Sequence, residues 1–251
     1  GGLGHFISAL SYELLEQYDQ AYIDYERMAE KQVGVELAGR ALVRIASALR
    51  YDDELGGWIE RFGPDTERPA DAASVVVIAG VGLGPFKREV TLPVPTPSGI
   101  LQWSVPSLQH RPQGVAHLVL RSIGLGAVET SVLEDVAKVS EENLSDRIGW
   151  LAARSAVRSL MKRELTKKLS NNYDLAGQIA GDLFMLVSER ADLRSWQTLP
   201  DTWQAARLWV APGEHELALE AIGGGAEVLG RFRLEAGETM LVLARTLGSR
   251  V

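Results

Sequence analysis

The stretch Arg194-Ser195-Trp196-Gln197-Thr198-Leu199-Pro200 lies where the sequence changes character. A helix-forming segment precedes it, and short segments of alternating apolar and polar residues follow it to the C-terminus. A proline cannot continue a helix, and a tryptophan beside an arginine suits a buried corner. We therefore predict that Arg194, Trp196 and Pro200 mark the place where the chain leaves its helices. If Trp196 is buried there, Trp196→Ala should lower the free energy of unfolding by ~3–5 kcal/mol.

Strand-forming segments occur on both sides of the helical block, at 74–121 and at 206–245. Residues 74–79, Ser-Val-Val-Val-Ile-Ala, predict a short buried strand because they are rich in β-branched side chains. The later strands are predicted at 206–210, 215–221, 228–234 and 239–245. Short turns between them favour an antiparallel meander of the kind found in small β-sandwich modules.

These patterns predict an α+β protein in which residues 74–251 form one β-sandwich-like domain with a helical insertion at about 131–190. Residues 1–62 form a separate helical region, and residues 63–73 form a linker rich in glycine and proline. On this view, the motif at 194–200 marks the point at which the chain re-enters its sheet. Arg194 is then placed to pair with an acid from 134–142.

The N-terminal helices have the spacing of a tetratricopeptide repeat. Residues 6–31 predict two helices, in which small and aromatic side chains recur at the packing positions Ala9, Tyr12, Tyr18, Ala21, Tyr25 and Met28. A second, looser pair is predicted at 35–49 and 53–62. Two repeats are too few to bury a solenoid core alone, so either further repeats precede them or the unit docks on the rest. A plain helical hairpin without repeat ancestry is the alternative.

The glycine-rich segment Gly80-Val81-Gly82-Leu83-Gly84-Pro85 follows the strand at 74–79, an order that occurs in dinucleotide-binding proteins. That fold needs a helix next, because the helix N-terminus binds the pyrophosphate. Here residues 86–94 alternate apolar and polar side chains, which predicts a strand. We therefore expect a hairpin or loop, and no cofactor.

Composition excludes several classes of function. The 251 residues include 26 Lys and Arg against 33 Asp and Glu, a net charge of −7, which is not the basic footprint of a nucleic-acid binder. There is no cysteine, so disulfides, thiol catalysis and cysteine-bound zinc are excluded. No apolar run reaches the ~18 residues of a membrane span.

Motifs of catalysis are weak in this sequence. Ser159-Leu160-Met161-Lys162 matches the S-x-x-K of penicillin-interacting enzymes, but the companion K-T-G strand is missing. His110 and His117 have no carboxylate cluster near them in sequence, so a metal site is not expected. We predict a protein without catalytic, cofactor or metal-binding residues. Carboxylates assembled only in three dimensions leave a hydrolase as the third hypothesis.

Two features are candidates for ligand binding. Trp103 lies among the prolines of 93–112, where it either receives a peptide or sugar or covers a sheet edge. Arg154, Arg158 and Lys162 are spaced four apart and so share one helix face. Ion pairs with the acidic stretch at 129–143 are the alternative role for this basic stripe.

Four segments in this order resemble a known family: Tyr18 to Tyr25, Gly82-Leu83-Gly84-Pro85-Phe86-Lys87, Asp146-Arg147 to Arg158, and Ala191 to Pro200. Together they are similar to uncharacterised bacterial lipoproteins that carry an N-terminal tetratricopeptide region. The resemblance covers most of the chain and is most specific at 191–200. It implies export, a lipidated cysteine upstream of Gly1, and attachment to the outer membrane from the periplasmic side. It implies no activity.

The sequence therefore predicts a non-enzymatic periplasmic lipoprotein that acts as a protein–protein interaction or assembly module of the bacterial cell envelope. An envelope protein is the expected partner, and an oligomer is compatible with the pattern. The alternative is a glycan- or peptidoglycan-binding protein linked to cell-wall synthesis, which would use Trp103, Arg154, Arg158 and Lys162.

Overall fold

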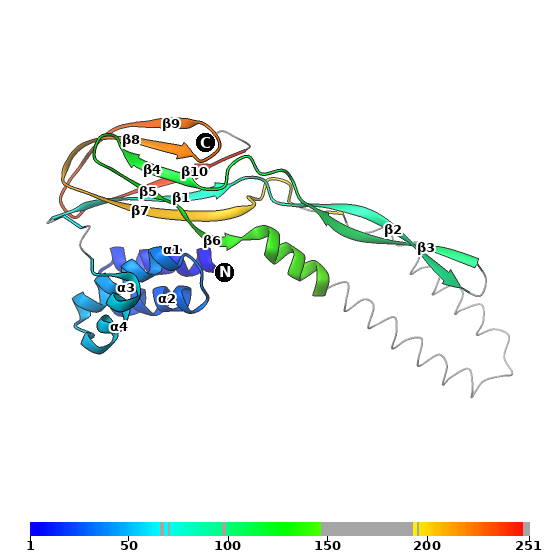
Figure 1. Ribbon diagram of the computed structural model, residues 1–251, viewed down its shortest axis with the longest axis horizontal. Helices are drawn as coiled ribbons and strands as arrows, with labels where there is room; N and C mark the ends of the chain where they lie inside the picture. The colour runs from blue at the N-terminus through cyan, green and yellow to red at the C-terminus, as the bar shows by residue number, and fades with distance from the viewer. Residues whose placement is uncertain (66–67, 70, 97–98, 147–192, 195, 248–251) are drawn as a thin grey trace. The chain divides into compact units, whose positions relative to one another are not determined.

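The structure is a computed structural model that describes residues 1–65, 68–69, 71–96, 99–146, 193–194 and 196–247. It is a mixed α+β protein whose N-terminal helices precede its strands (Figure 1). The helices are α1 (Gly2–Leu14), α2 (Tyr18–Glu30), α3 (Val35–Leu49) and α4 (Asp52–Phe62). The α+β class and the four N-terminal helices agree with the prediction.

The strands of the described residues form three sheets. They are β1 (Ala73–Val81), β2 (Phe86–Thr96), β3 (Gly99–Gln109), β4 (Leu118–Ser122), β5 (Gly126–Glu129), β6 (Ser131–Asp135), β7 (Thr202–Val210), β8 (Gly213–Ala221), β9 (Ala226–Leu234) and β10 (Thr239–Arg245). Two sheets have four strands, in the orders β10-β1-β7-β6 and β5-β4-β8-β9, and β2 pairs with β3 in the third. The pairs are antiparallel except for β1 with β10, which are parallel.

Two compact units contain these elements. One comprises Gly1–Gly84, Pro112–Val136 and Thr198–Val251, and so holds the four helices and both four-stranded sheets. The other comprises Pro85–Arg111 and Ala137–Gln197. Its described part includes the β2–β3 hairpin.

Strand β1 is buried at every position. Its side chains alternate between the two faces of the sheet. Val75 and Val77 share a core with residues of the second sheet such as Leu219, whereas Val76 and Ile78 pack with the helices. The first sheet is therefore the middle layer of this unit, with the helices on one side and the second sheet on the other (Figure 1). Burial on both faces explains why the segment is continuously apolar.

The helices are packed onto this sheet. Large buried side chains from α1, α2 and α3, among them Phe6, Tyr25 and Leu42, join Leu133 of β6 and Ala205 of β7 in one core. Of the two arrangements that the sequence left open, the described residues show a helical unit docked on the strands.

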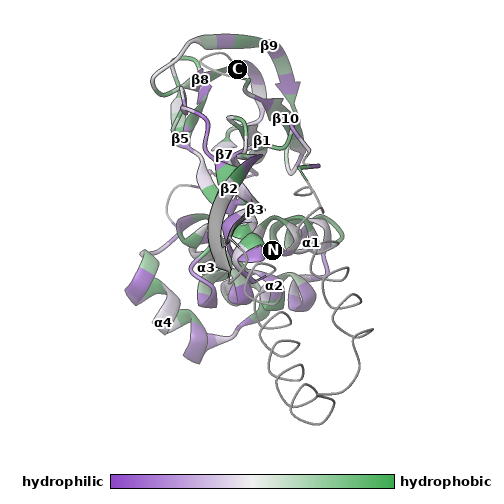
Figure 2. Cartoon of the chain, turned by 90° about the vertical axis from the view of Figure 1, so that its right-hand side faces the viewer, coloured by the Kyte–Doolittle hydropathy of each residue, from purple (hydrophilic) through white to green (hydrophobic). Residues whose placement is uncertain are grey.

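Helix α4 packs against its neighbours more lightly. It has no fully buried residue, and Trp58 Nε1 donates a hydrogen bond to Tyr22 Oη at 2.9 Å. A Cβ at Gly39 would overlap the Phe62 ring, so the close approach of α3 to the end of α4 needs a glycine. Figure 2 shows hydrophilic and hydrophobic residues interspersed along α4, as expected for a helix at the surface.

The predicted C-terminal meander is wrong in its pairing. The four strands occur close to their expected positions, but only β8 and β9 pair with each other. Strand β7 lies between β1 and β6, and β10 pairs with β1. Alternation of side chains identifies a strand and its faces, but it carries no information about the neighbouring strand.

The predicted helical insertion begins later than expected. Residues 131–135 form strand β6, which pairs with β7 and places Leu133 in the core with the helices, and residues 136–146 are helical. The remainder of the predicted insertion, 147–190, lies outside the described residues.

The glycine-rich segment leads into a strand, as the alternation at 86–94 predicted. Strands β2 and β3 pair along their whole length, from Phe86 opposite Gln109 to Thr96 opposite Gly99. Pro93, Pro95 and Pro106 all lie in one alternate set of register positions. Proline has no N–H to donate. In antiparallel pairs the hydrogen-bonded positions alternate with non-hydrogen-bonded ones, so prolines confined to one set leave the other set free to form the hydrogen bonds between the strands.

The corner motif differs from its prediction at Trp196. Pro200 is buried, but the Trp196 side chain is 73% exposed, so the expectation of a buried tryptophan is wrong. Backbone hydrogen bonds hold the chain here instead: Gly84 N donates to Leu199 O and Asp201 N donates to Val81 O, each at 2.9 Å. These bonds fix the entry into β7 without packing from the indole.

We therefore expect Trp196→Ala to change the free energy of unfolding by no more than about 0.5 kcal/mol, as for an ordinary surface position. Trp203→Ala is the positive control, because Trp203 packs against the helical core and should cost more. Urea denaturation of both variants measures the difference. Equal destabilisation would contradict the exposed position of Trp196.

A second pair of variants tests the layer order. Leu219 is fully buried between the sheets and Leu243 on β10 is 80% exposed, although both are strand leucines. Leu219→Ala should cost about 2–5 kcal/mol, and Leu243→Ala should stay within about 0.5 kcal/mol. Denaturation curves that shift by similar amounts would show that the two faces are wrongly assigned.

Candidate binding pocket

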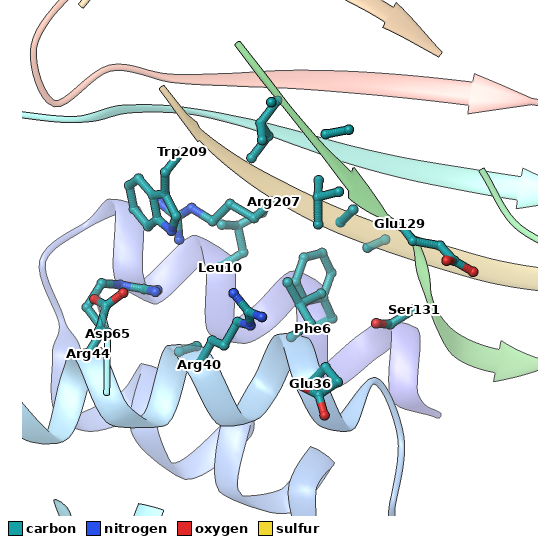
Figure 3. Close-up of a pocket in the computed structure, with 18 of the residues that line it drawn as sticks. Phe6, Leu10, Glu36, Arg40, Arg44, Asp65, Glu129, Ser131, Arg207 and Trp209 are labelled. Carbon is teal, nitrogen blue, oxygen red and sulfur yellow. The ribbon is translucent and has the colours of Figure 1, made fainter. Parts of the chain in front are cut away.

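A pocket of about 660 Å³ lies between the helices and the first sheet (Figure 3). Its apolar wall includes Phe6 and Leu10 of α1, Leu37 of α3 and Val128 of β5. Its charged residues are Glu36, Arg40, Arg44, Asp65, Glu129 and Arg207. The volume falls within the range of roughly 300–1,000 Å³ that is typical of ligand sites.

A buried carboxylate organises one side of this pocket. Glu13 Oε1 accepts hydrogen bonds from Arg44 Nη2 at 2.7 Å and from Arg207 Nη1 at 2.6 Å. Its other oxygen, Oε2, accepts the phenol proton of Tyr25 at 2.9 Å. The side chains of Glu13, Arg44 and Arg207 are only 8%, 10% and 9% exposed. Four elements, α1, α2, α3 and β7, are thus tied together by one carboxylate.

The electrostatics of this cluster favour the ionised carboxylate. Burial by itself raises the pKa of Glu13, but the charges of Arg44 and Arg207 and the hydrogen bonds to Glu13 outweigh it, so the pKa lies below 4.5. Burial, together with the Glu13 charge, raises the pKa of Tyr25 above its ordinary value of 10. Tyr25 therefore remains a neutral donor and Glu13 a charged acceptor.

Positive charge exceeds negative charge within this cluster, because one carboxylate faces two guanidinium groups. The ring of Trp209 helps to stabilise this positive charge. The guanidinium carbon of Arg207 lies 4.1 Å from the centroid of the ring, and those of Arg68 and Arg44 lie at 5.0 and 5.1 Å. Cation–π contacts of this kind attract a partly desolvated guanidinium to the ring face. Figure 3 shows Arg207 beside Trp209 at the edge of the pocket.

Local structure explains why these residues meet. Phe6, Leu10 and Glu13 are spaced four and three apart on α1, so they lie on one helix face. Arg207 and Trp209 are alternate residues of β7, and they share with Ala205 the face that meets the helices. Helical and strand periodicity therefore direct a carboxylate and a guanidinium toward each other from separate layers.

The binding residues predicted from sequence are not assembled within the described part of the chain. Trp103 lies opposite Leu92 in the β2–β3 register, and its side chain is not among those described. Arg154, Arg158 and Lys162 lie outside the described residues. Of the corner motif, Arg194 accepts a hydrogen bond at its carbonyl oxygen from Lys87 Nζ at 3.1 Å.

Sequence reasoning missed Glu13, Arg44, Arg207 and Trp209. One signal was present: Arg207 interrupts an otherwise mostly apolar strand that was already predicted, and an arginine there needs a buried partner. The partner itself carried no signal, because Glu13 lies 194 residues away in the chain.

A second buried polar pair is closed to ligands. His215 Nδ1 lies 3.0 Å from Ser122 Oγ, and His215 Nε2 lies 2.7 Å from Ala211 O. The two residues are 4% and 1% exposed, so no substrate reaches the hydroxyl. This serine and histidine satisfy each other inside the core of the two sheets. The part of the chain that the structure describes also holds no group of three or more His, Asp or Glu residues suited to a metal ion.

No family model, curated protein or solved structure matches the chain. None of the helices in the described ranges has the length and apolar character that a membrane crossing requires.

Removing the charge of Glu13 tests the role of the cluster. Glu13→Gln keeps the size of the side chain but leaves Arg44 and Arg207 buried without a counter-ion, which should cost about 3–5 kcal/mol. Glu129→Gln is the matched control, because Glu129 also lines the pocket but its side chain is 57% exposed. Thermal denaturation at neutral pH compares the two. A variant as stable as the control would show that the cluster does not hold the layers together.

The pH dependence of stability gives a second test of the Glu13→Gln variant. The folded pKa of Glu13 is lowered, so its stabilising contribution is present above pH 4.5 and is lost as the pH falls through the folded value. Glu13→Gln should therefore lose less stability than the wild type on acidification from pH 5 to pH 3. Burial raises the pKa of Asp24, but the hydrogen bonds from Ser8 and His5 outweigh it and the pKa is lowered, so both proteins keep some acid sensitivity.

Proposed function

We propose that this protein is a non-enzymatic interaction module of the bacterial cell envelope, which holds a segment of a partner protein in the pocket between its helices and sheet. The observation that carries the proposal is the Arg44, Arg207 and Trp209 cluster at a partly open pocket with an apolar wall. Arginine, tryptophan and tyrosine are the residues that most often dominate the energy of protein interfaces.

The cluster is held in place before any partner arrives. Glu13 fixes one end of both guanidinium groups, and the tryptophan ring lies against them. A partner therefore loses little affinity to the ordering of these long side chains. This rigidity supports a recognition role.

The location in the envelope comes from the resemblance to lipoproteins with tetratricopeptide regions. On that basis we infer that α1 to α4 are tetratricopeptide-like hairpins and that the two four-stranded sheets are a sandwich-like module. The protein would work in the periplasm, attached to the outer membrane through a lipidated cysteine upstream of Gly1.

A second surface supports a role in assembly. Strand β10 is at the edge of its sheet as far as the structure describes it, and Leu241 and Leu243 are 52% and 80% exposed. Exposed apolar residues on an unpaired edge strand are uncommon in proteins that work alone. They suit contact with a partner or with a further copy of the chain.

The alternative function, glycan or peptidoglycan binding, is less well supported at this pocket. Sugars stack on free aromatic faces, whereas guanidinium groups already lie over the ring of Trp209. That alternative depends on Trp103, Arg154, Arg158 and Lys162. Sedimentation with purified sacculi separates the two functions: binding that a Trp103→Ala and Arg158→Ala double variant abolishes would favour the glycan.

The proposal predicts that a specific envelope protein copurifies with the wild type and with Trp196→Ala, but that its recovery falls at least about tenfold with Trp209→Ala. Trp196 is the matched control, being an exposed tryptophan that does not line the pocket. Purified partner and protein should then bind in isothermal titration calorimetry with the same ranking. The variant Leu243→Glu tests whether the exposed face of β10 contributes to binding of the partner.

The proposal fails if envelope extracts yield no partner and the protein remains monomeric at high concentration. Equal recovery with Trp196→Ala and Trp209→Ala would instead move the interaction away from the pocket.

A further inference from the structure

The guanidinium of Arg207 retains hydrogen-bonding capacity at the pocket. Glu13 accepts from its Nη1, and Nε is a buried donor without a hydrogen-bond acceptor among the described residues. A buried donor of this kind is rare in native structures and calls for an explanation. Because Arg207 lines the pocket, an acceptor carried by a ligand is such an explanation.

Geometry selects the kind of acceptor. With Nη1 bound to Glu13, the side edge of the guanidinium, formed by Nε and the other terminal nitrogen, is the edge that includes the unpaired donor. A carboxylate accepts two parallel hydrogen bonds from such an edge.

The other residues that line the pocket indicate the charge and the polarity of the rest of the ligand. Among the residues that line the pocket, Glu36, Asp65 and Glu129 offset the charge of the three arginines, so a polyanion such as a phosphate chain would be repelled. The apolar wall of Phe6, Leu10 and Leu37 favours a hydrocarbon body. A monoanion attached to apolar groups matches both properties.

We propose that the pocket recognises one carboxylate, from an acidic side chain of a partner protein that is flanked by apolar residues, and that Arg207 binds it through Nε. This inference rests on the proposed interaction function and names the chemistry of the partner segment. Arg207 Nε is buried, so the side chains around it must move slightly when the carboxylate enters.

The test uses the whole chain and two matched peptides, acetyl-Leu-Leu-Glu-amide and acetyl-Leu-Leu-Gln-amide, with octanoate as a small organic acid. The Nε–H signals of arginine are followed in ¹H–¹⁵N correlation spectra during each titration. The Arg207 signal is assigned with Arg207→Lys, or by its proximity to Trp209 in nuclear Overhauser spectra if that variant does not fold. The Glu peptide should shift this signal to saturation and bind at least about tenfold more tightly than the Gln peptide.

Each other outcome overturns part of the proposal. Equal binding of the Glu and Gln peptides rules out carboxylate recognition, and a signal that never moves rules out a role for Arg207. Octanoate that binds as tightly as the Glu peptide identifies a site for free organic acids rather than for a protein segment. Recovery of an envelope partner together with an unmoved Arg207 signal would retain the interaction function and reject only this inference. Saturable binding of the Glu peptide, without recovery of any envelope partner, would retain this inference and reject the interaction function.

Discussion

Strand β1 is packed between two layers, and the positions of the other elements follow from its burial. Its alternate side chains supply one core with the helices and another with the second sheet. Pairing with β7 on one side and β10 on the other satisfies its backbone, since neither face reaches water. The parallel partner, β10, is the last strand of the chain, so the first sheet is complete only when this strand has paired with β1.

The pocket lies between the helix layer and the first sheet, at the place where charged side chains from both layers meet. A helix layer and a sheet cannot match everywhere, and the side chains between them include Glu13, Arg44 and Arg207 as well as apolar residues. Their ion pairs join the layers, but at the cost of desolvating three charges. An apolar filling would avoid that cost.

Much of the fold could be predicted from sequence periodicity. The helices at 6–31, 35–49 and 53–62 and most of the strands occur near their expected ranges, because local side-chain patterns reflect which face is buried. The pairing of β10 with β1 could not be predicted, since both strands show the same apolar character whichever neighbour they have. The burial of Trp196 was wrongly inferred from residue type, although backbone hydrogen bonds at 199–201 perform the role assigned to it.

The sequence by itself determined the α+β class, the lack of cysteine chemistry, the turn after β1 and the positions of most elements. These properties depend on composition and on contacts between near neighbours in the chain. Only the tertiary structure decided the order of strands and the site, because Glu13, Arg44, Arg207 and Trp209 lie on α1, α3 and β7. Ionic and cation–π contacts depend on distance in space, and no spacing along the chain records that distance.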